Sequence, residues 1–140
     1  MENLLKFYIN GEWVAPLSDA TMPVLNPATE KQIATVALGN EADVDRAVAA
    51  ASTAFEEFSQ TSKEGRLALL RKVRAITEAR MEELAQAMRM EMGAPITMSR
   101  DVQADAAVGH LDGFITALEE LEERLKLANG DIMVREPIGV

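Results

Sequence analysis

The chain has 140 residues, a formal net charge of −9, 48% hydrophobic and 26% charged side chains, and no cysteine. This length allows one domain with a hydrophobic core, and the composition is typical of a globular protein. The excess of acidic side chains disfavours nucleic acid and anionic membranes as partners. Without cysteine, disulfides, thiolate nucleophiles and thiolate metal sites are excluded.

The first residues lack the basic region and the long apolar run of a secretory signal. No segment approaches the roughly 20 consecutive apolar residues that span a membrane. We therefore expect a cytoplasmic protein.

Two β-hairpins are predicted within residues 7–37. Asn10-Gly11 lies between two short apolar runs. This dipeptide is the strongest short-range signal for a two-residue turn, because both turn residues need a positive φ. Residues 22–25 and 32–37 have the pattern of a second strand pair, and Asn26-Pro27 between them favours a turn. Hairpins this small are not stable alone.

Four helices are predicted from apolar residues that recur every three or four positions, and they cover residues 41–58, 62–78, 81–92 and 97–127. Asn40 is a suitable N-cap for the first helix. Thr61 and Glu64 have the spacing of a capping box for the second. Gly93 and Pro95 are expected to end the third.

The predicted helix over residues 97–127 carries two different stripes. One stripe is apolar and is expected to be the packing face: Ala104, Ala107, Leu111, Phe114, Leu118, Leu121 and Leu125. The other contains only small residues: Ala106, Gly109, Gly113 and Ala117. A glycine within a helix costs roughly 1 kcal/mol relative to alanine. The two glycines therefore indicate close approach of another backbone or, as the alternative, a ligand groove.

The end of the chain is predicted to be a strand within residues 131–140 that has no partner strand. Asn129-Gly130 is expected to stop the preceding helix in a left-handed conformation. The last residues form an apolar run, which leaves an unpaired strand edge.

Motifs that carry chemistry are scarce in this sequence. It has no glycine-rich phosphate-binding motif and no nucleophile paired with a base. The one histidine, His110, cannot form a metal cluster alone, and no carboxylate pair can be assigned to acid–base catalysis. The residues by themselves indicate a helix-rich α/β segment without a self-sufficient active site.

Five stretches together resemble the N-terminal part of the NAD(P)-dependent aldehyde dehydrogenase superfamily. They are Phe7-Tyr8-Ile9-Asn10-Gly11-Glu12-Trp13, Asn26-Pro27-Ala28-Thr29, Asp43-Val44-Asp45-Arg46-Ala47-Val48, Glu91-Met92-Gly93-Ala94-Pro95 and Arg135-Glu136-Pro137-Ile138-Gly139-Val140. The resemblance implies an α/β, aldehyde-dehydrogenase-like fold. In it, residues 1–130 belong to the cofactor-binding domain, and residues 131–140 begin the first strand that leads into the oligomerisation and Rossmann region.

The resemblance also implies a function for a longer parent enzyme. That enzyme would oxidise an aldehyde to a carboxylic acid with NAD or NADP, and it would form a homo-oligomer. The catalytic and cofactor-binding residues of the family lie downstream of this chain, so the segment alone is expected to be inactive, to bind no cofactor and to have a structural role. The alternative is a stand-alone acidic helical module that binds a protein partner.

Two smaller features of the family map onto residues of this chain. A monovalent cation site is implied at Val24 and Leu25, through their backbone carbonyls, and at Glu91, because carbonyls and one carboxylate suit a hard cation. A solvated Glu91 side chain near the helix end is the alternative. The resemblance places Val102 and Ala106 near the substrate entrance.

Overall fold

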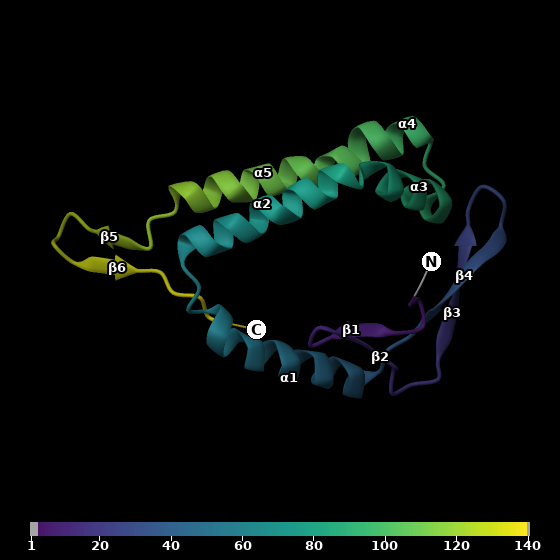
Figure 1. The fold of residues 1–140 in the computed structure, drawn as a ribbon, viewed down its shortest axis with the longest axis horizontal. Helices are drawn as coiled ribbons and strands as arrows, with labels where there is room; N and C mark the ends of the chain where they lie inside the picture. The colour runs from purple at the N-terminus through teal and green to yellow at the C-terminus, as the bar shows by residue number, and fades with distance from the viewer. Residues whose placement is uncertain (1–2, 140) are drawn as a thin grey trace.

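A computed structural model of the chain describes residues 3–139. Four short strands come first and are followed by helices and a last strand pair (Figure 1). In chain order the elements are β1 (Phe7–Ile9), β2 (Glu12–Val14), β3 (Thr21–Asn26), β4 (Lys31–Ala37), α1 (Glu41–Phe58), α2 (Lys63–Ala79), α3 (Met81–Met92), α4 (Ile96–Met98), the π-helix η1 (Ser99–Ala104), α5 (Asp105–Glu120), β5 (Arg124–Lys126) and β6 (Ile132–Val134). The fold is α/β, as predicted.

Both N-terminal hairpins form, and each is an antiparallel pair of its own. In the β1–β2 turn, φ is 53° at Asn10 and 79° at Gly11, the left-handed conformation predicted from this dipeptide. In the β3–β4 pair the register shifts between Val24 and Leu25, which is a β-bulge. The bulge lies near the strand end that carries the predicted cation site.

Helix α1 covers the predicted range, and its N-terminus is held by a reciprocal cap. The Asn40 side chain accepts a hydrogen bond from the Asp43 backbone N–H, and the Asp43 carboxylate accepts one from the Asn40 N–H. The same buried carboxylate accepts a bond from the Leu17 N–H at 2.9 Å. Asp43 therefore ties the segment between the hairpins to the start of the helix.

The start of α2 differs from the prediction at the cap. Ser62, not Thr61, is the N-cap, and its hydroxyl accepts a bond from the Gly65 N–H. The Thr61 hydroxyl instead donates to the Phe58 carbonyl at 2.7 Å, in the turn that follows α1. Adjacent hydroxyl residues compete for the capping position, and the turn engages the first of them.

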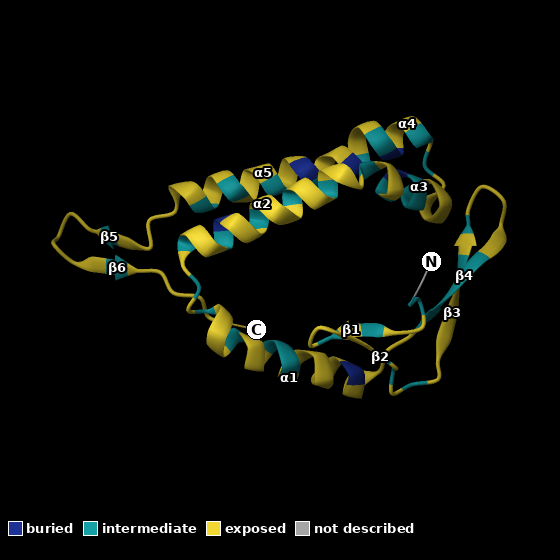
Figure 2. Ribbon diagram, in the orientation of Figure 1, coloured by how far each residue is buried: buried dark blue, intermediate teal, exposed yellow. Residues whose placement is uncertain are grey.

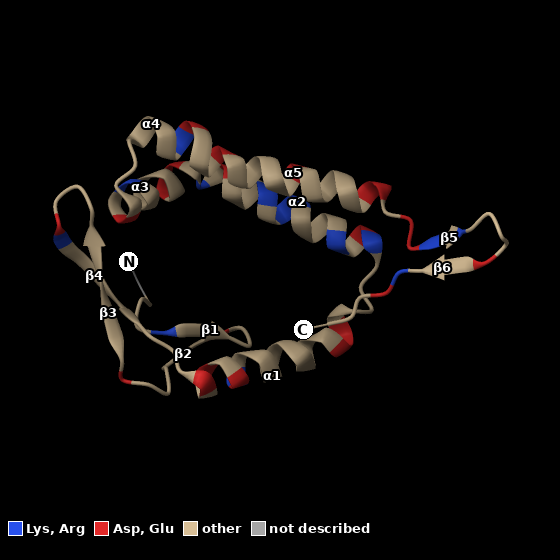
Figure 3. Cartoon of the chain, turned by 180° about the vertical axis from the view of Figure 1, so that it is seen from behind, with Lys and Arg blue, Asp and Glu red and all other residues tan. Residues whose placement is uncertain are grey.

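Helices α2 and α5 pack side by side and antiparallel (Figure 1). Leu67 and Val108 are buried between polar flanks where Arg and Lys of α2 oppose acidic residues of α5 and the following turn (Figure 3). The ion pairs between these segments are Arg66–Glu123, Arg71–Glu119 and Arg74–Asp112. The order of these pairs along the two segments fixes the antiparallel direction.

The predicted helix over residues 97–127 starts within one residue of the observed helical segment, but it ends too late and its first part is not regular α-helix. It begins as the short α4, continues as the π-helix η1 and becomes α-helical only from Asp105. It ends at Glu120, since Leu121 is extended. Four glutamates between positions 119 and 123 place negative charge at a helix C-terminus, which the helix dipole disfavours. The Lys63 ammonium then donates to the carbonyls of Glu119 and Leu121, satisfying acceptors at the helix end.

The prediction of an unpaired terminal strand is also wrong. Residues 124–126, expected to be helical, form β5, which pairs antiparallel with β6. Asn129-Gly130 belongs to the turn of this hairpin instead of a helix stop, with φ of 94° at Gly130. After β6 the chain returns to α1, where a Cβ on Gly139 would lie 3.3 Å from the Phe55 ring.

The small-residue stripe of α5 lies on its exposed side. Ala106, Gly109, Gly113 and Ala117 are all exposed. A Cβ added at either glycine would meet nothing within 4 Å, so the expected close backbone contact is not formed within residues 3–139. The packing side instead includes Ala104 and Val108, and Phe114, which was expected on it, is 66% exposed.

The chain follows an open ring in which α1 and β1–β2 lie across from α2 and α5 (Figure 1). Most of its residues are exposed or only partly buried (Figure 2). Among residues 3–139 the buried apolar side chains are Leu67, Ala85, Ala104 and Val108. The accessible surface is 10171 Å², whereas a compact monomer of 15.3 kDa exposes about 7,100 Å². The ring thus exposes about 3,000 Å² that a compact chain would bury.

Candidate functional site

The predicted cation site lies where β3 meets the end of α3. Val24 is half-buried and Leu25 exposed on the two sides of the bulge. Helix α3 ends at Gly93, whose φ is 71°, and a Cβ there would lie 3.1 Å from the Pro27 side chain. This close contact brings the end of α3 against the residue that follows β3.

Glu91 lies on the last turn of α3, two residues before that contact, and is exposed. The structure therefore brings the elements that carry Val24, Leu25 and Glu91 together. Residues 3–139 contain no group of three or more His, Asp or Glu side chains suited to a metal ion. A cation here would depend on backbone carbonyls and one carboxylate, the ligand set of a weak hard-cation site. The site stays a prediction.

The predicted substrate entrance lies on one exposed face of η1 and α5. Val102 is 58% exposed, and Ala106 is exposed four positions later. The small residues of α5 continue this face. The π-helix changes the phase of the turns at this point, and π-helical turns are frequent at functional sites. Next to Val102, the Gln103 Oε1 atom is buried without a hydrogen-bond partner among the described residues.

The π-helix is attached to α3 on its other side. Ser99 is fully buried, and the Arg100 guanidinium pairs with the Glu82 carboxylate at 2.8 Å. Hydrogen bonds from Arg100 and then from Gln86 lower the pKa of Glu82 to about 2. This ion pair holds the segment that carries Val102 in position.

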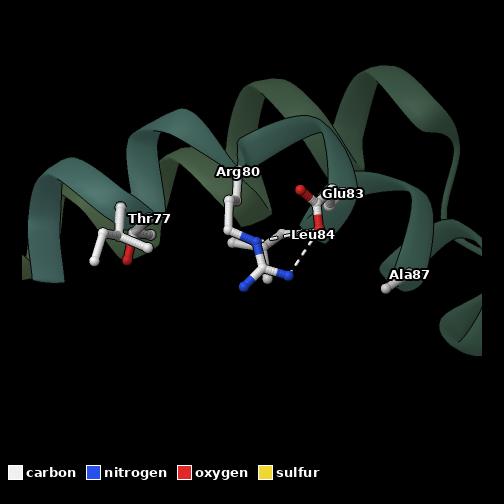
Figure 4. A pocket seen from close by; sticks show the side chains of 6 residues that line it. Thr77, Arg80, Glu83, Leu84 and Ala87 are labelled. Atoms are coloured by element: carbon white, nitrogen blue, oxygen red, sulfur yellow. Dashed lines mark hydrogen bonds and ion pairs between the residues drawn. The ribbon is translucent and has the colours of Figure 1, made fainter. Parts of the chain in front are cut away.

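An open pocket at the junction of α2 and α3 was not anticipated from the sequence (Figure 4). Its lining residues are Ile76, Thr77, Arg80, Glu83, Leu84 and Ala87. Arg80 pairs with Glu83 at 2.7 Å, and this bond raises the pKa of Arg80 and lowers that of Glu83. The two charges compensate each other, which leaves an apolar surface on either side of them. The signal in the sequence was the break in helical pattern at Arg80.

The N-termini of α1 and α2 are already occupied by side-chain caps. Helix N-termini bind phosphate through free backbone N–H groups. At α1 and α2, the Asn40 and Ser62 side chains already accept from such groups. His110, the only histidine of the chain, is exposed.

No helix within residues 3–139 is long and apolar enough to cross a membrane.

The chain is similar in sequence to known proteins. Residues 13–140 match the profile of the aldehyde dehydrogenase family. A Staphylococcus aureus protein named "putative aldehyde dehydrogenase" is 44% identical over 142 aligned residues, which cover 100% of this chain and 29% of that protein. The chain therefore spans less than a third of the length of this relative.

Solved structures share the fold. An aldehyde dehydrogenase from Bartonella henselae has a TM-score of 0.87 at 37% identity, covering 90% of this chain and 26% of its own. A mutant of aldehyde dehydrogenase C from Pseudomonas syringae, in complex with NAD+ and octanal, has a TM-score of 0.86 at 44% identity. The match covers 88% of this chain and 25% of that protein. The open ring is thus similar to a part of larger folded chains.

Proposed function

Because the chain belongs to the aldehyde dehydrogenase family, we propose that it is the N-terminal segment of an enzyme that oxidises an aldehyde to a carboxylic acid with NAD or NADP. The observation that carries this proposal is the match over 100% of the chain to only 29% of a relative. The exposed surface in excess of a compact monomer supports it, because such a surface suits packing against a larger body.

The segment itself has a structural role in this proposal. The chain contains no cysteine, and the resemblance places the catalytic residues of the family downstream of it. Residues 1–130 then form part of the cofactor-binding domain. Residues 131–140 lead into the oligomerisation and Rossmann region, starting from the β5–β6 hairpin that projects from the ring (Figure 1). The parent is a cytoplasmic homo-oligomer.

In the same proposal, two groups of residues in this chain contribute to the function of the parent enzyme. Val102 and Ala106 lie at the substrate entrance, and their exposure leaves them available to an aldehyde. Val24, Leu25 and Glu91 hold a monovalent cation near the Pro27–Gly93 contact. Neither group takes part in bond making.

A stand-alone acidic module that binds a protein partner would also expose apolar surface. The alternatives differ in the reading frame after Val140. A continuation that also matches the aldehyde dehydrogenase family is expected for the enzyme, and a stop or an unrelated sequence for the module.

A covalent chimera tests the proposed function. The chain replaces the aligned N-terminal part of the Staphylococcus aureus relative, and the chimera is assayed for NAD(P)H formation with octanal as one of several probe aldehydes. We expect aldehyde-dependent NAD(P)H formation, with the unmodified relative as the control. A folded chimera that is inactive beside an active control contradicts the proposal.

A further inference from the structure

Helix α2 has a second apolar face that nothing in residues 3–139 covers. Leu69, Val73 and Ile76 are 47%, 41% and 48% exposed. Beyond the Arg80–Glu83 pair, the face continues into α3 with Leu84 and Ala87, which line the pocket at the junction (Figure 4). We call these five apolar residues the α2–α3 strip.

The α2–α3 strip differs from the face that packs on α5. Leu67 is buried and Arg74 pairs with Asp112 on the α5 side. A helix on the surface of a globular protein carries one apolar stripe, whereas a helix with apolar residues on two faces lies between two packed layers. Helix α2 therefore carries apolar residues on a second face, and within residues 3–139 only the face toward α5 is covered.

Charge decides between possible occupants of the strip. The chain carries a net charge of −9, so two copies repel each other where their surfaces approach within the screening length of about 8 Å. The strip itself carries no uncompensated charge, because Arg80 and Glu83 pair with each other. It thus fits an apolar protein surface and offers no charge to attract a nucleic acid or an anionic lipid.

We propose that the α2–α3 strip binds the remaining part of an aldehyde dehydrogenase chain when that part is supplied as a separate polypeptide. The inference rests on the proposed function and adds that the docking surface assembles without a covalent link. The length outside this chain supports this occupant, since the chain covers 29% of the Staphylococcus aureus relative. The chain exposes about 3,000 Å² more than a compact monomer of its mass, and the α2–α3 strip is part of that exposed surface.

Co-expression of the chain with the Staphylococcus aureus relative that lacks its aligned N-terminal part tests this proposal. We expect a soluble complex on co-purification and NAD(P)H formation with octanal that neither polypeptide gives alone. Val73→Asp places a charge in the strip and should raise the chain concentration that gives half-maximal activity about tenfold or more.

The matched control is Ala75→Asp, an exposed position roughly 160° around the helix from Val73. It introduces the same charge and should leave that concentration within about twofold. Circular dichroism of each variant alone checks that α2 still forms. If Val73→Asp unfolds the chain, Ile76→Gln, which keeps the helix and removes apolar surface, replaces it.

Each other outcome overturns the proposal. Equal effects of Val73→Asp and Ala75→Asp would place the interface elsewhere. A remainder that stays insoluble or inactive beside the chain, while the covalent chimera is active, would refute docking in trans and leave the proposed function intact. An inactive chimera would instead refute the proposed function. A dimer of the chain alone that Val73→Asp dissociates would make a second copy the occupant.

Discussion

Two glycines on neighbouring helices have opposite roles. Gly93 is in the left-handed region with φ of 71°, and the Pro27 side chain closes the space where a Cβ would lie. Gly113 is within α5, and a Cβ there would meet nothing within 4 Å. From the sequence, Gly93 is expected to end a helix and Gly113 to allow another backbone to approach, and the structure confirms only the first role. Only the surrounding atoms distinguish a required glycine from a dispensable one.

Alanine at these two positions should change the stability of the chain in opposite directions. Gly93→Ala should destabilise it by about 1–2 kcal/mol, because a left-handed residue with a Cβ is strained and the Pro27 contact must shift. Gly113→Ala should stabilise it by up to about 1 kcal/mol, through helix propensity alone. Urea denaturation followed by circular dichroism measures both. A loss of stability in Gly113→Ala would show that another segment approaches that face after all.

The helices bury few apolar side chains against one another, and ion pairs contribute to the contacts between them. Arg74 bonds to both Asp112 of α5 and Glu78 of its own helix. Arg100 joins η1 to Glu82 of α3. Exposed ion pairs are individually weak, typically below about 1 kcal/mol, but these lie at the α2–α5 and α3–η1 contacts. The contacts between these helices therefore depend on whether a few carboxylates are ionised.

The contact between η1 and α3 should weaken in acid. Arg100 and Gln86 lower the pKa of Glu82 from 4.5 to about 2. A carboxylate with a lowered pKa stabilises the fold above its unfolded pKa, and this contribution is lost as pH falls from about 4.5 to about 2. The pKa of Glu83 is lowered in the same direction by Arg80.

Helical circular dichroism across that pH interval, compared with Glu82→Gln, measures this effect. The variant should show a smaller loss of signal between the two pH values, because it has no carboxylate to protonate at that position. Identical pH profiles for the two proteins would mean that the Arg100–Glu82 pair contributes nothing to the fold.

The molecule as a whole is an open ring with a thin core. Its accessible surface is 10171 Å², whereas a compact chain of this mass exposes about 7,100 Å². The exposed surface is apolar on the α2–α3 strip and on α1, where Val44, Val48 and Phe58 are exposed. The N-termini of α1 and α2 are capped by the side chains of Asn40 and Ser62.

The isolated chain should not bind NAD+ with measurable affinity. The reason is physical: the Asn40 and Ser62 side chains occupy N–H groups that a pyrophosphate would need at the ends of α1 and α2. Calorimetric titration of the chain with NAD+ measures this. Saturable heat in the micromolar range would contradict it, and a parallel titration of the active Staphylococcus aureus relative serves as the positive control.

Local signals in the sequence were sufficient for the β1–β2 turn, the extent of α1 and the family of the chain. Asn10-Gly11 and the Asn40–Asp43 cap depend on residues within four positions of each other. A contact with a distant segment would have to break these local interactions to change the structure there. The cation and entrance positions were inferred from family resemblance, and the structure brings the elements of the first together at Pro27 and Gly93. The pocket at the α2–α3 junction had no comparable motif.

The end of α5 and the pairing of β5 with β6 depended on contacts between distant residues. A helical pattern continued through Leu125, but Lys63 bonds to the carbonyls at Glu119 and Leu121 from a helix some 56 positions earlier in the chain. Two of the four glutamates near the helix end, Glu119 and Glu123, pair with Arg71 and Arg66 of α2. Periodicity reports which face is apolar, but competition between helix and strand for one segment is decided by the partner that reaches it in space.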